Sequence, residues 1–431
     1  MSTALEPVAP LVEHFFRHES GRLVAVLTRL FGWSHYDLVE DVVQETLLDA
    51  LQAWRVRGVP DNPPAWIRRV ARNKILDALR RGRIGERALR ECAPERPGAD
   101  VGLDELFDDS AIEDSQLRMM FACCDPRLDR ADQVALTLKA LCGFGHAEIA
   151  RALLLGEETV KKRLQRATRA LGERGAVLEA PRDEELDPRL DGVHQSLYLL
   201  FNEGYSASRG ERAMRIELCE EAARLCHLLC SQPRFATPAT QALMALMLFH
   251  AARFDARVDG AGAFLLIDEQ DRTLWDRALI ERAREFLDAS AAGRAVSTFH
   301  LQAGIASLHC AAPSYAETDW HGILRLYDAL IAIDPSPVYV LNRAVVVAEI
   351  DGPLVAIRAV ESVASDPALR RYHLLDATLG ELHRRAGDLD RARACFAEAR
   401  AKTTSEFDRE LLDRRLAACE GRAGARFRRL R

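Results

Sequence analysis

The chain has 431 residues, of which 48% are hydrophobic and 6% aromatic, and its formal net charge is −6. This length predicts two or three domains rather than one, and the prevalence of good helix formers over β-branched runs predicts an all-α fold. No segment is apolar over the length that a bilayer requires, and the N-terminus lacks the features of a signal peptide. We therefore expect a cytoplasmic protein without a membrane partner, whose ten cysteines are free thiols.

Charge alternates along the first part of the chain, although the net charge is negative. A basic segment covers residues 55–83, an acidic segment covers 91–114, and a second basic cluster covers 161–169. Because an average charge hides such local fields, the negative total does not exclude contacts with nucleic acid.

The N-terminal residues predict three helices. The first spans about residues 8–31 and the second about 37–54, and a loop rich in Gly, Pro and Asn follows at 55–64. Asn62 can cap a third helix, whose first turn tolerates the adjacent prolines. That helix has apolar residues at four-residue steps, which form one stripe: Ile67, Ala71, Ile75 and Leu79.

A linker and a helix-turn-helix come next. Residues 82–109 contain Gly, Pro and many acids without a clear period, which predicts a linker. Helices resume near Ile112, and a short helix at 146–153 precedes a longer one with a single apolar face. Two helices joined by a tight turn, the second of them strongly basic, are typical of a helix-turn-helix.

Beyond a boundary at 180–191, the chain is helical almost throughout and contains a repeat. Small and apolar residues recur at the same offsets in three sets: Ile323, Tyr327 and Leu330; Ala356, Val360 and Val363; and Ala392, Phe396 and Ala399. Gly380 and Gly387 fall at the helix-packing and turn positions of tetratricopeptide repeats. The spacing favours tetratricopeptide-like helix pairs, and an array of unrelated helical hairpins is the alternative.

Three segments resemble extracytoplasmic-function RNA polymerase sigma factors, which belong to the sigma-70 family. Residues 37–50 resemble their polymerase-binding helix, residues 64–81 their promoter-melting helix, and residues 143–171 their second DNA-binding domain. Within residues 185–420, the segments 197–205, 268–277 and 335–344 resemble the branch of this family that carries a fused C-terminal helical domain.

The resemblance implies four parts and two partners. Sigma region 2 would cover residues 8–82, an acidic linker 83–111, a region 4 helix-turn-helix 112–178, and a C-terminal regulatory domain 185–420. The expected partners are promoter DNA and core RNA polymerase, which is contacted through its β′ clamp helices and β flap. The linker would thread through polymerase channels, either as a solvated spacer or as a mimic of nucleic-acid charge.

Residues at matching positions imply three contact surfaces. The docking face for polymerase consists of Asp41, Gln44, Glu45 and Leu48. Contacts with the −10 element and the melted strand involve Arg55, Arg57, Asn62, Trp66, Arg69, Arg72, Asn73 and Arg80. Contacts with the −35 element involve Glu158, Thr159, Lys161, Lys162, Arg163 and Arg166. The alternative role for Trp66 is that of a core residue at the start of a helix.

The C-terminal domain contains a polar set with two interpretations. Its members are Asn202, Glu203, Asp271, Arg272, Trp275 and Asn342. They either line a groove for a protein or small-molecule partner or form structural hydrogen bonds, and the structural interpretation is favoured.

Sites for metal, cofactor or catalysis are not expected. Cys219, Cys226 and Cys230 lie at helical steps that are typical of core residues rather than zinc ligands. The sequence contains no standard phosphate loop and no convincing pair of nucleophile and base. We therefore expect a protein that is not an enzyme.

Three functions remain. The first is a sigma factor whose C-terminal domain modulates its activity. The second is a helix-turn-helix transcription regulator with a ligand- or protein-sensing helical-repeat domain, which would bind duplex DNA without polymerase. The third is a helical-repeat enzyme or scaffold with a degenerate DNA-binding front. The polymerase-docking helix and the intact basic clusters favour the first.

Overall fold

The computed structural model describes residues 8–80, 109–153, 155–173, 178–205, 214–260, 265–293, 295–367, 369–370 and 372–427. Within these ranges the chain is all-α and has no β-strand, so the predicted fold class is confirmed. The chain divides into two compact units, Met1–Leu200 and Phe201–Arg431.

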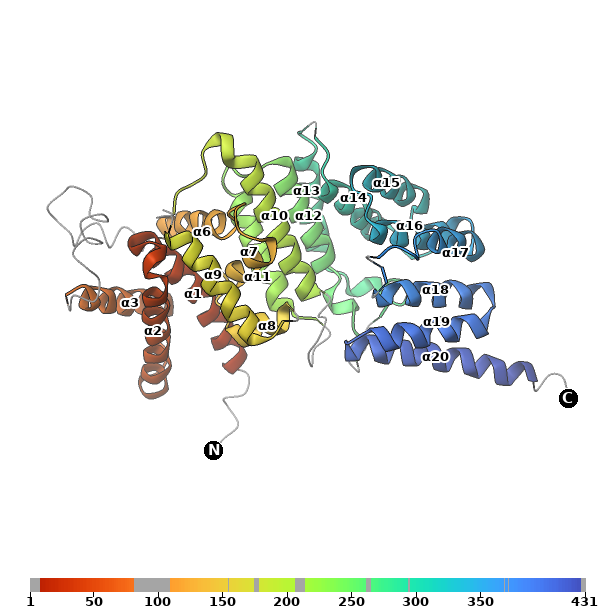
Figure 1. Cartoon of the computed structure of the whole chain (residues 1–431), viewed down its shortest axis with the longest axis horizontal. Coiled ribbons are helices and arrows are strands. Elements are labelled where there is room, and N and C mark those ends of the chain that lie inside the picture. Colours follow the sequence, from red (N-terminus) through yellow and green to blue (C-terminus); the bar gives the residue numbers. More distant parts are fainter. Residues whose placement is uncertain are drawn as a thin grey trace. The chain divides into compact units, whose positions relative to one another are not determined.

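Helices of the first unit follow the predicted order (Figure 1). They are α1 (Val8–Phe31), the short 3-10 helix η1 (Trp33–His35), α2 (Tyr36–Arg57), α3 (Pro63–Arg80), α6 (Asp109–Cys123), α7 (Arg130–Ala140), α8 (His146–Ala152), α9 (Glu157–Glu173) and α10 (Asp183–Tyr205), whose last residues belong to the second unit. The predicted linker at 82–109 lies, except for its last residue, outside the described residues.

One boundary differs from the prediction. Helix α2 continues beyond Trp54 to Arg57, so Arg55 and Arg57 lie on its last turn and not in the predicted loop. Gly58 ends the helix because its φ of 82° lies in the left-handed region, and its N–H donates to the carbonyl oxygen of Trp54 at 3.0 Å. Arg55 and Arg57 are therefore helical residues, and the prediction that they lie in the loop is wrong.

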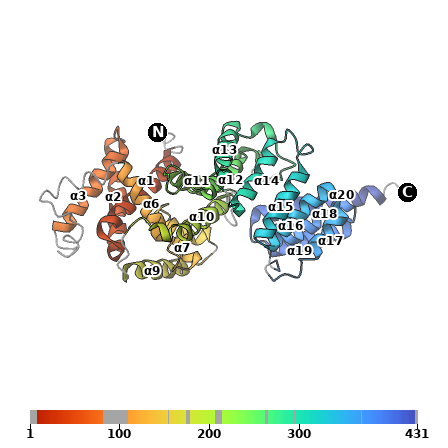
Figure 2. The same cartoon turned by 90° about the horizontal axis from the view of Figure 1, so that it is seen from above.

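Helices before and after residues 81–108 pack against one another in the first unit, as Figure 2 also shows for α1 and α6. A Cβ atom on Gly21 of α1 would lie 1.9 Å from the carbonyl oxygen of Leu141, so only glycine permits this approach. Lys139 Nζ of α7 lies 2.8 Å from Glu40 Oε1 of α2, in an ion pair that is largely buried. The two predicted DNA-binding parts therefore share one packed interior.

The second unit is an array of helices joined by short connections (Figure 1). After the end of α10 it contains α11 (Ile216–Cys230), α12 (Pro238–Ala251), the 3-10 helices η2 (Phe254–Ala256) and η3 (Arg272–Leu274), α13 (Arg277–Ser290), α14 (Thr298–Ala311), α15 (Trp320–Ile333), α16 (Pro337–Ile350), α17 (Pro353–Glu361), α18 (His373–Ala386), α19 (Leu389–Lys402) and α20 (Glu406–Phe427).

The predicted repeat positions fall on α15, α17 and α19, the second helices of three successive pairs, except for Val363, which lies in the turn after α17. Their side chains are buried except for those of Tyr327 and Val363, which are half-buried. Gly380 of α18 faces Phe396 of α19, where an added Cβ would meet the ring at 2.6 Å. Gly387 ends α18 with a φ of 84°, which favours glycine. These contacts explain the glycine spacing.

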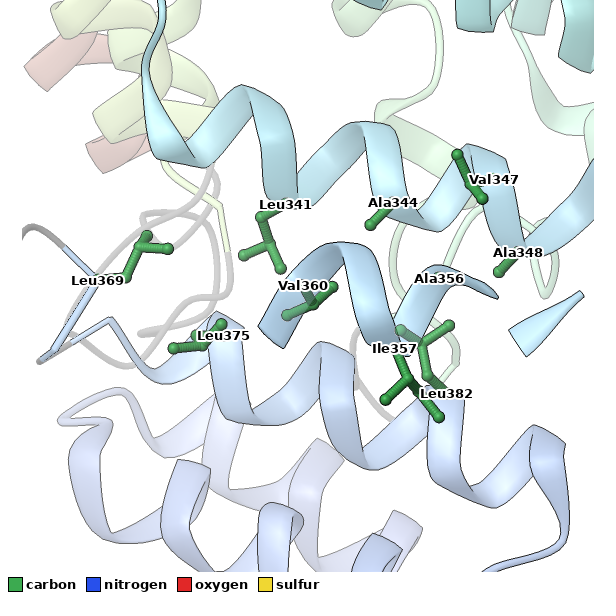
Figure 3. Close-up of a cluster of buried hydrophobic side chains, with 10 residues drawn as sticks. All are labelled: Leu341, Ala344, Val347, Ala348, Ala356, Ile357, Val360, Leu369, Leu375 and Leu382. Carbon is green, nitrogen blue, oxygen red and sulfur yellow. The ribbon is translucent and has the colours of Figure 1, made fainter. Parts of the chain in front are cut away.

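Apolar side chains from α16, α17 and α18 form a continuous core between consecutive pairs. Figure 3 shows Leu341 and Ala344 of α16, Val360 of α17 and Leu382 of α18 within one cluster. All four are at most 2% exposed. Each helix pair thus buries its apolar face against its neighbour, which is how repeat arrays are stabilised.

Candidate nucleic-acid interface

Helix α2 is amphipathic, and its polar face carries the predicted docking residues. Asp41, Gln44, Glu45 and Leu48 are all exposed, and the apolar side chain of Leu48 is 56% exposed. The opposite face of α2 packs against the rest of the first unit. Its buried residues are Val39, Val42, Val43, Thr46 and Ala50. The exposed face therefore combines carboxylates with an apolar residue that no described side chain covers.

Lys74 of α3 neutralises part of this acidic face. Its Nζ lies 3.2 Å from Glu45 Oε2 and 3.0 Å from Asp49 Oδ2. The ion pairs also connect α3 to α2, so that the docking face and the predicted melting helix lie side by side.

Helix α3 begins as the sequence predicts. The N–H of Ala65 donates to Asn62 Oδ1 at 3.1 Å, which satisfies one of the free amides of the first turn. Ile67, Ala71 and Ile75 are buried along one stripe, whereas Arg69 and Asn73 are exposed and Arg72 is half-buried. The side chains of Leu79 and Arg80 lie outside the described residues.

Trp66 is half-buried, which is compatible with both of its interpretations. Its ring packs edge-on against that of Trp54, with centroids 5.8 Å apart. It also borders a shallow surface groove between α2 and α3, lined by Asp49, Gln52, Ala53, Val56, Arg57, Trp66 and Val70. One edge of the tryptophan thus belongs to the core and the other to this groove.

The helix-turn-helix consists of α8 and α9. Glu148 Oε2 accepts the N–H of Gly145 at 2.7 Å and so caps α8. One face of α9 is buried at the predicted positions, which are Val160, Leu164, Ala167 and Leu171. Glu158, Thr159 and Lys162 are exposed, and Lys161 is half-buried beside Glu158, with Nζ 3.1 Å from Oε1. The predicted base-reading half of the helix therefore faces outward.

Arg163 and Arg166 share a partner that sequence reasoning missed. Asp132 of α7 is only 2% exposed, and its Oδ1 accepts from Arg163 Nη1 at 3.3 Å. Its Oδ2 accepts from Arg166 Nε at 3.0 Å. A charge-assisted pair of this kind fixes the direction of both guanidinium groups. No sequence signal marks Asp132, because it lies more than 30 residues from either arginine.

Replacing Asp132 by alanine should lower the free energy of unfolding by about 2 kcal/mol, because charged hydrogen bonds to a buried acceptor are lost. Urea denaturation followed by circular dichroism measures the change. The matched control is Asp129→Ala, since the carboxylate of Asp129 is exposed and lies 3.6 Å from Arg166. The Asp129→Ala variant should lose much less free energy of unfolding, because exposed ion pairs contribute little to stability. Equal losses in the two variants would contradict a structural role for the buried carboxylate.

In the second unit, the predicted polar set does not form one site. Arg272 stacks on the Trp275 ring at 4.5 Å, and both are buried. Asp271 is exposed and caps η3 by accepting the N–H of Thr273 at 2.9 Å. The other members lie elsewhere: Asn202 and Glu203 are half-buried near the end of α10, and Asn342 is exposed on α16.

Cys219 and Cys226 of α11 are buried in the core, as their spacing predicts, and Cys230 is half-buried. Cys219 Sγ donates to the carbonyl oxygen of Phe201 at 3.3 Å, and burial raises the pKa of Cys219 to about 12. A thiol that stays protonated is a poor metal ligand. Over the described part of the chain, no cluster of three His, Cys, Asp or Glu side chains has the arrangement of a metal site. The same residues contain no helix that is long and apolar enough to span a bilayer.

Three family models match parts of the chain. Residues 15–84 match the family of sigma-70 region 2, residues 118–171 match sigma-70 region 4, and residues 189–291 match a family of unknown function, DUF6596. An uncharacterised protein of Rhizobium meliloti (strain 1021) is 36% identical over 388 residues, which are 90% of this chain and 91% of that protein.

A second relative matches a shorter part of the chain. The ECF RNA polymerase sigma factor SigL of Mycobacterium tuberculosis (strain ATCC 25618 / H37Rv) is 34% identical over 133 residues, which are 31% of this chain and 71% of that protein. No solved structure matches the chain.

Proposed function

The chain belongs to the extracytoplasmic-function family of RNA polymerase sigma factors, and we propose that its fused C-terminal domain modulates the initiation that its first unit directs. As a sigma factor it binds core RNA polymerase and promoter DNA.

The observation that carries this function is the pairing of α2 with α3 ahead of a helix-turn-helix. A repressor needs only the helix-turn-helix to reach duplex DNA. Here an exposed acidic face on α2 lies beside a helix whose outer side carries Arg69 and Asn73. That combination supports docking on polymerase by α2 and holding of a melted strand by the neighbouring α3.

We assign the contacts residue by residue. Asp41, Gln44, Glu45 and Leu48 would meet the β′ clamp helices, and region 4 would meet the β flap. The groove bordered by Trp66 and Arg57 would receive an unstacked base of the −10 element. Lys162 and Glu158 would reach base edges of the −35 element, while Arg163 and Arg166, oriented by Asp132, would hold phosphates.

The similarity to the Rhizobium meliloti protein supports the proposal that the C-terminal domain modulates initiation. The Rhizobium meliloti relative matches 90% of this chain and so includes parts of both units, whereas the SigL match covers 31% of the chain. Because the C-terminal domain is joined to the N-terminal part of the chain in this protein and in that relative, it is suited to modulating the sigma regions of the same chain.

The test is promoter-specific transcription with purified core polymerase, comparing the full chain with residues 1–200. The shorter chain should end at Leu200, because α10 packs on the first unit: Cys124 Sγ lies 3.5 Å from Ser196 Oγ, and Arg130 Nη1 lies 3.3 Å from the Gly192 carbonyl oxygen. Initiation by either form supports the sigma function, and the difference gives the sign of the C-terminal effect. Duplex binding without any polymerase binding would favour the alternative, a helix-turn-helix regulator that senses a ligand or protein.

Replacing Arg72 and Arg80 together by alanine should reduce open-complex formation about tenfold while polymerase binding stays nearly unchanged, since two cationic contacts with the melted strand are lost. Permanganate footprinting measures melting, and co-elution with core polymerase measures docking. The control replaces Arg282 and Arg284 of α13 together by alanine. Both of these arginines pair with neighbouring glutamates. Unchanged melting in the first variant would refute the role of α3.

A further inference from the structure

The second unit buries two arginines that have no carboxylate partner. Arg253, which follows α12, is 8% exposed, and Arg272 of η3 is 9% exposed. Neither forms an ion pair with any carboxylate in the described part of the chain. Because a guanidinium group stays protonated in proteins, both positive charges are removed from water without compensation by an anion.

Neutral groups hold these two side chains in place. Arg253 donates through Nε and Nη2 to Gln270 Oε1, at 3.2 and 3.1 Å, and Gln270 Nε2 donates to the Leu265 carbonyl oxygen at 3.2 Å. Arg272 Nη1 donates to the carbonyl oxygens of His309 and Ala312, both at 2.7 Å, at the end of α14. The arginines are therefore positioned by dipoles rather than by charges.

Trp275 lies against both guanidinium groups. The ring centroid is 4.5 Å from Arg272 Cζ and 5.3 Å from Arg253 Cζ, so one indole connects the two charges. Trp275 is itself 2% exposed, and its Nε1 donates to no described atom. Arg272 Nη2 is likewise buried without an acceptor.

Two histidines, His250 and His309, lie near the buried arginines. Burial, reinforced by nearby arginines, lowers the pKa of His250 and of His309 to about 3, so both rings are neutral. The Nδ1 atom of each is buried without a hydrogen-bond partner among the described residues, and in the suitable tautomer it is a donor. The cluster thus presents several donor groups that have no acceptor among the described residues.

We propose that Arg253, Arg272 and Trp275, flanked by His250 and His309, form an anion-binding site for a small molecule that carries a phosphate or carboxylate group. An oxyanion accepts from indole, imidazole and guanidinium donors; a phosphate dianion would neutralise both guanidinium charges, and a carboxylate would neutralise one of them. Since both arginines are less than 10% exposed, the group that reaches them is small and not a protein surface. Arg253, Arg272, Trp275 and His250 lie within residues 189–291, which match a family of unknown function, and His309 lies beyond them on α14.

The first experiment measures thermal unfolding of the full chain in rising concentrations of sodium phosphate, at constant ionic strength set with sodium chloride. Binding to the folded chain alone should raise Tm in a saturable way. Arg272→Met should weaken the effect at least about tenfold, because charged hydrogen bonds to the anion are lost. The control, Arg282→Met, removes an exposed arginine of α13 that pairs with Glu285 and should respond like the wild type.

A second readout covers the case in which Arg272→Met fails to fold, since Arg272 also holds the end of α14. Phosphate should change the tryptophan fluorescence of the wild type, and Trp275→Phe should abolish that change. Arg253→Lys, which keeps the charge but loses the planar fork, should bind phosphate about tenfold more weakly. A parallel titration with sodium acetate distinguishes a carboxylate from a phosphate ligand.

The proposal is overturned if neither phosphate nor acetate gives a saturable response, or if the response is the same in Arg253→Lys, Trp275→Phe and the wild type. Because no polymerase is present in these experiments, their result is independent of the sigma function.

Discussion

Raising the salt concentration from about 50 to about 200 mM should weaken binding of the holoenzyme to promoter DNA by about a thousandfold. Each phosphate that a Lys or Arg neutralises releases condensed counterions, so the logarithm of the binding constant falls linearly with the logarithm of the salt concentration. The proposed contacts on α2, α3 and α9 include enough cations to neutralise about six phosphates, which predicts a slope near −5.

Fluorescence anisotropy of a labelled promoter at several salt concentrations measures this slope. Lys162→Ala should make it shallower by about one unit, because Lys162 is exposed on the predicted DNA face of α9. Arg284→Ala should leave it unchanged, because Arg284 lies on α13 and pairs with Glu281 at 2.6 Å. A flat salt response, or equal slopes in the wild type and Lys162→Ala, would contradict the proposed DNA faces.

Lowering the pH from 7 to 5 should destabilise the second unit by about 4 kcal/mol. His250 is held near Arg253, Arg257 and His309, and His309 is held near Arg253 and Arg272; burial and these charges lower the pKa of each histidine from 6.5 to about 3. Between about pH 6.5 and 3 the unfolded chain therefore binds more protons, so stability is lost as the pH falls through this window. At pH 5 each histidine contributes about 2 kcal/mol of the loss.

Urea denaturation at both pH values, followed by tryptophan fluorescence, measures the difference. His250→Asn and His309→Asn should each reduce the pH-dependent loss by about half, because a side chain that does not titrate binds no proton on unfolding. His321→Asn is the control, since His321 is exposed on α15. If all three variants lose as much stability as the wild type, the buried histidines are not the source of acid sensitivity.

The helices and the family resemblance could be predicted from local patterns. The spacing of apolar residues predicted α1 at residues 8–31 and the buried faces of α3 and α9, and Asn62 indicated where α3 begins. Such signals act between residues three or four positions apart, so they are fully contained in the sequence. The end of α2 was predicted three residues early, because the loop rich in Gly, Pro and Asn was expected to begin directly after Trp54, whereas Gly58 ends the helix.

Long-range pairs were decided only by tertiary packing. Asp132 contacts Arg163 and Arg166 because α7 packs against α9. Arg253 contacts Trp275 because the residues after η3 pack against the end of α12. Partners tens of residues apart depend on how whole helices are oriented, which apolar periodicity does not specify. The sequence by itself therefore determined which helices form, which face of each is buried, and the sigma-factor family. Which charges are paired, and which remain buried without a counter-ion, was decided by the packing of those helices.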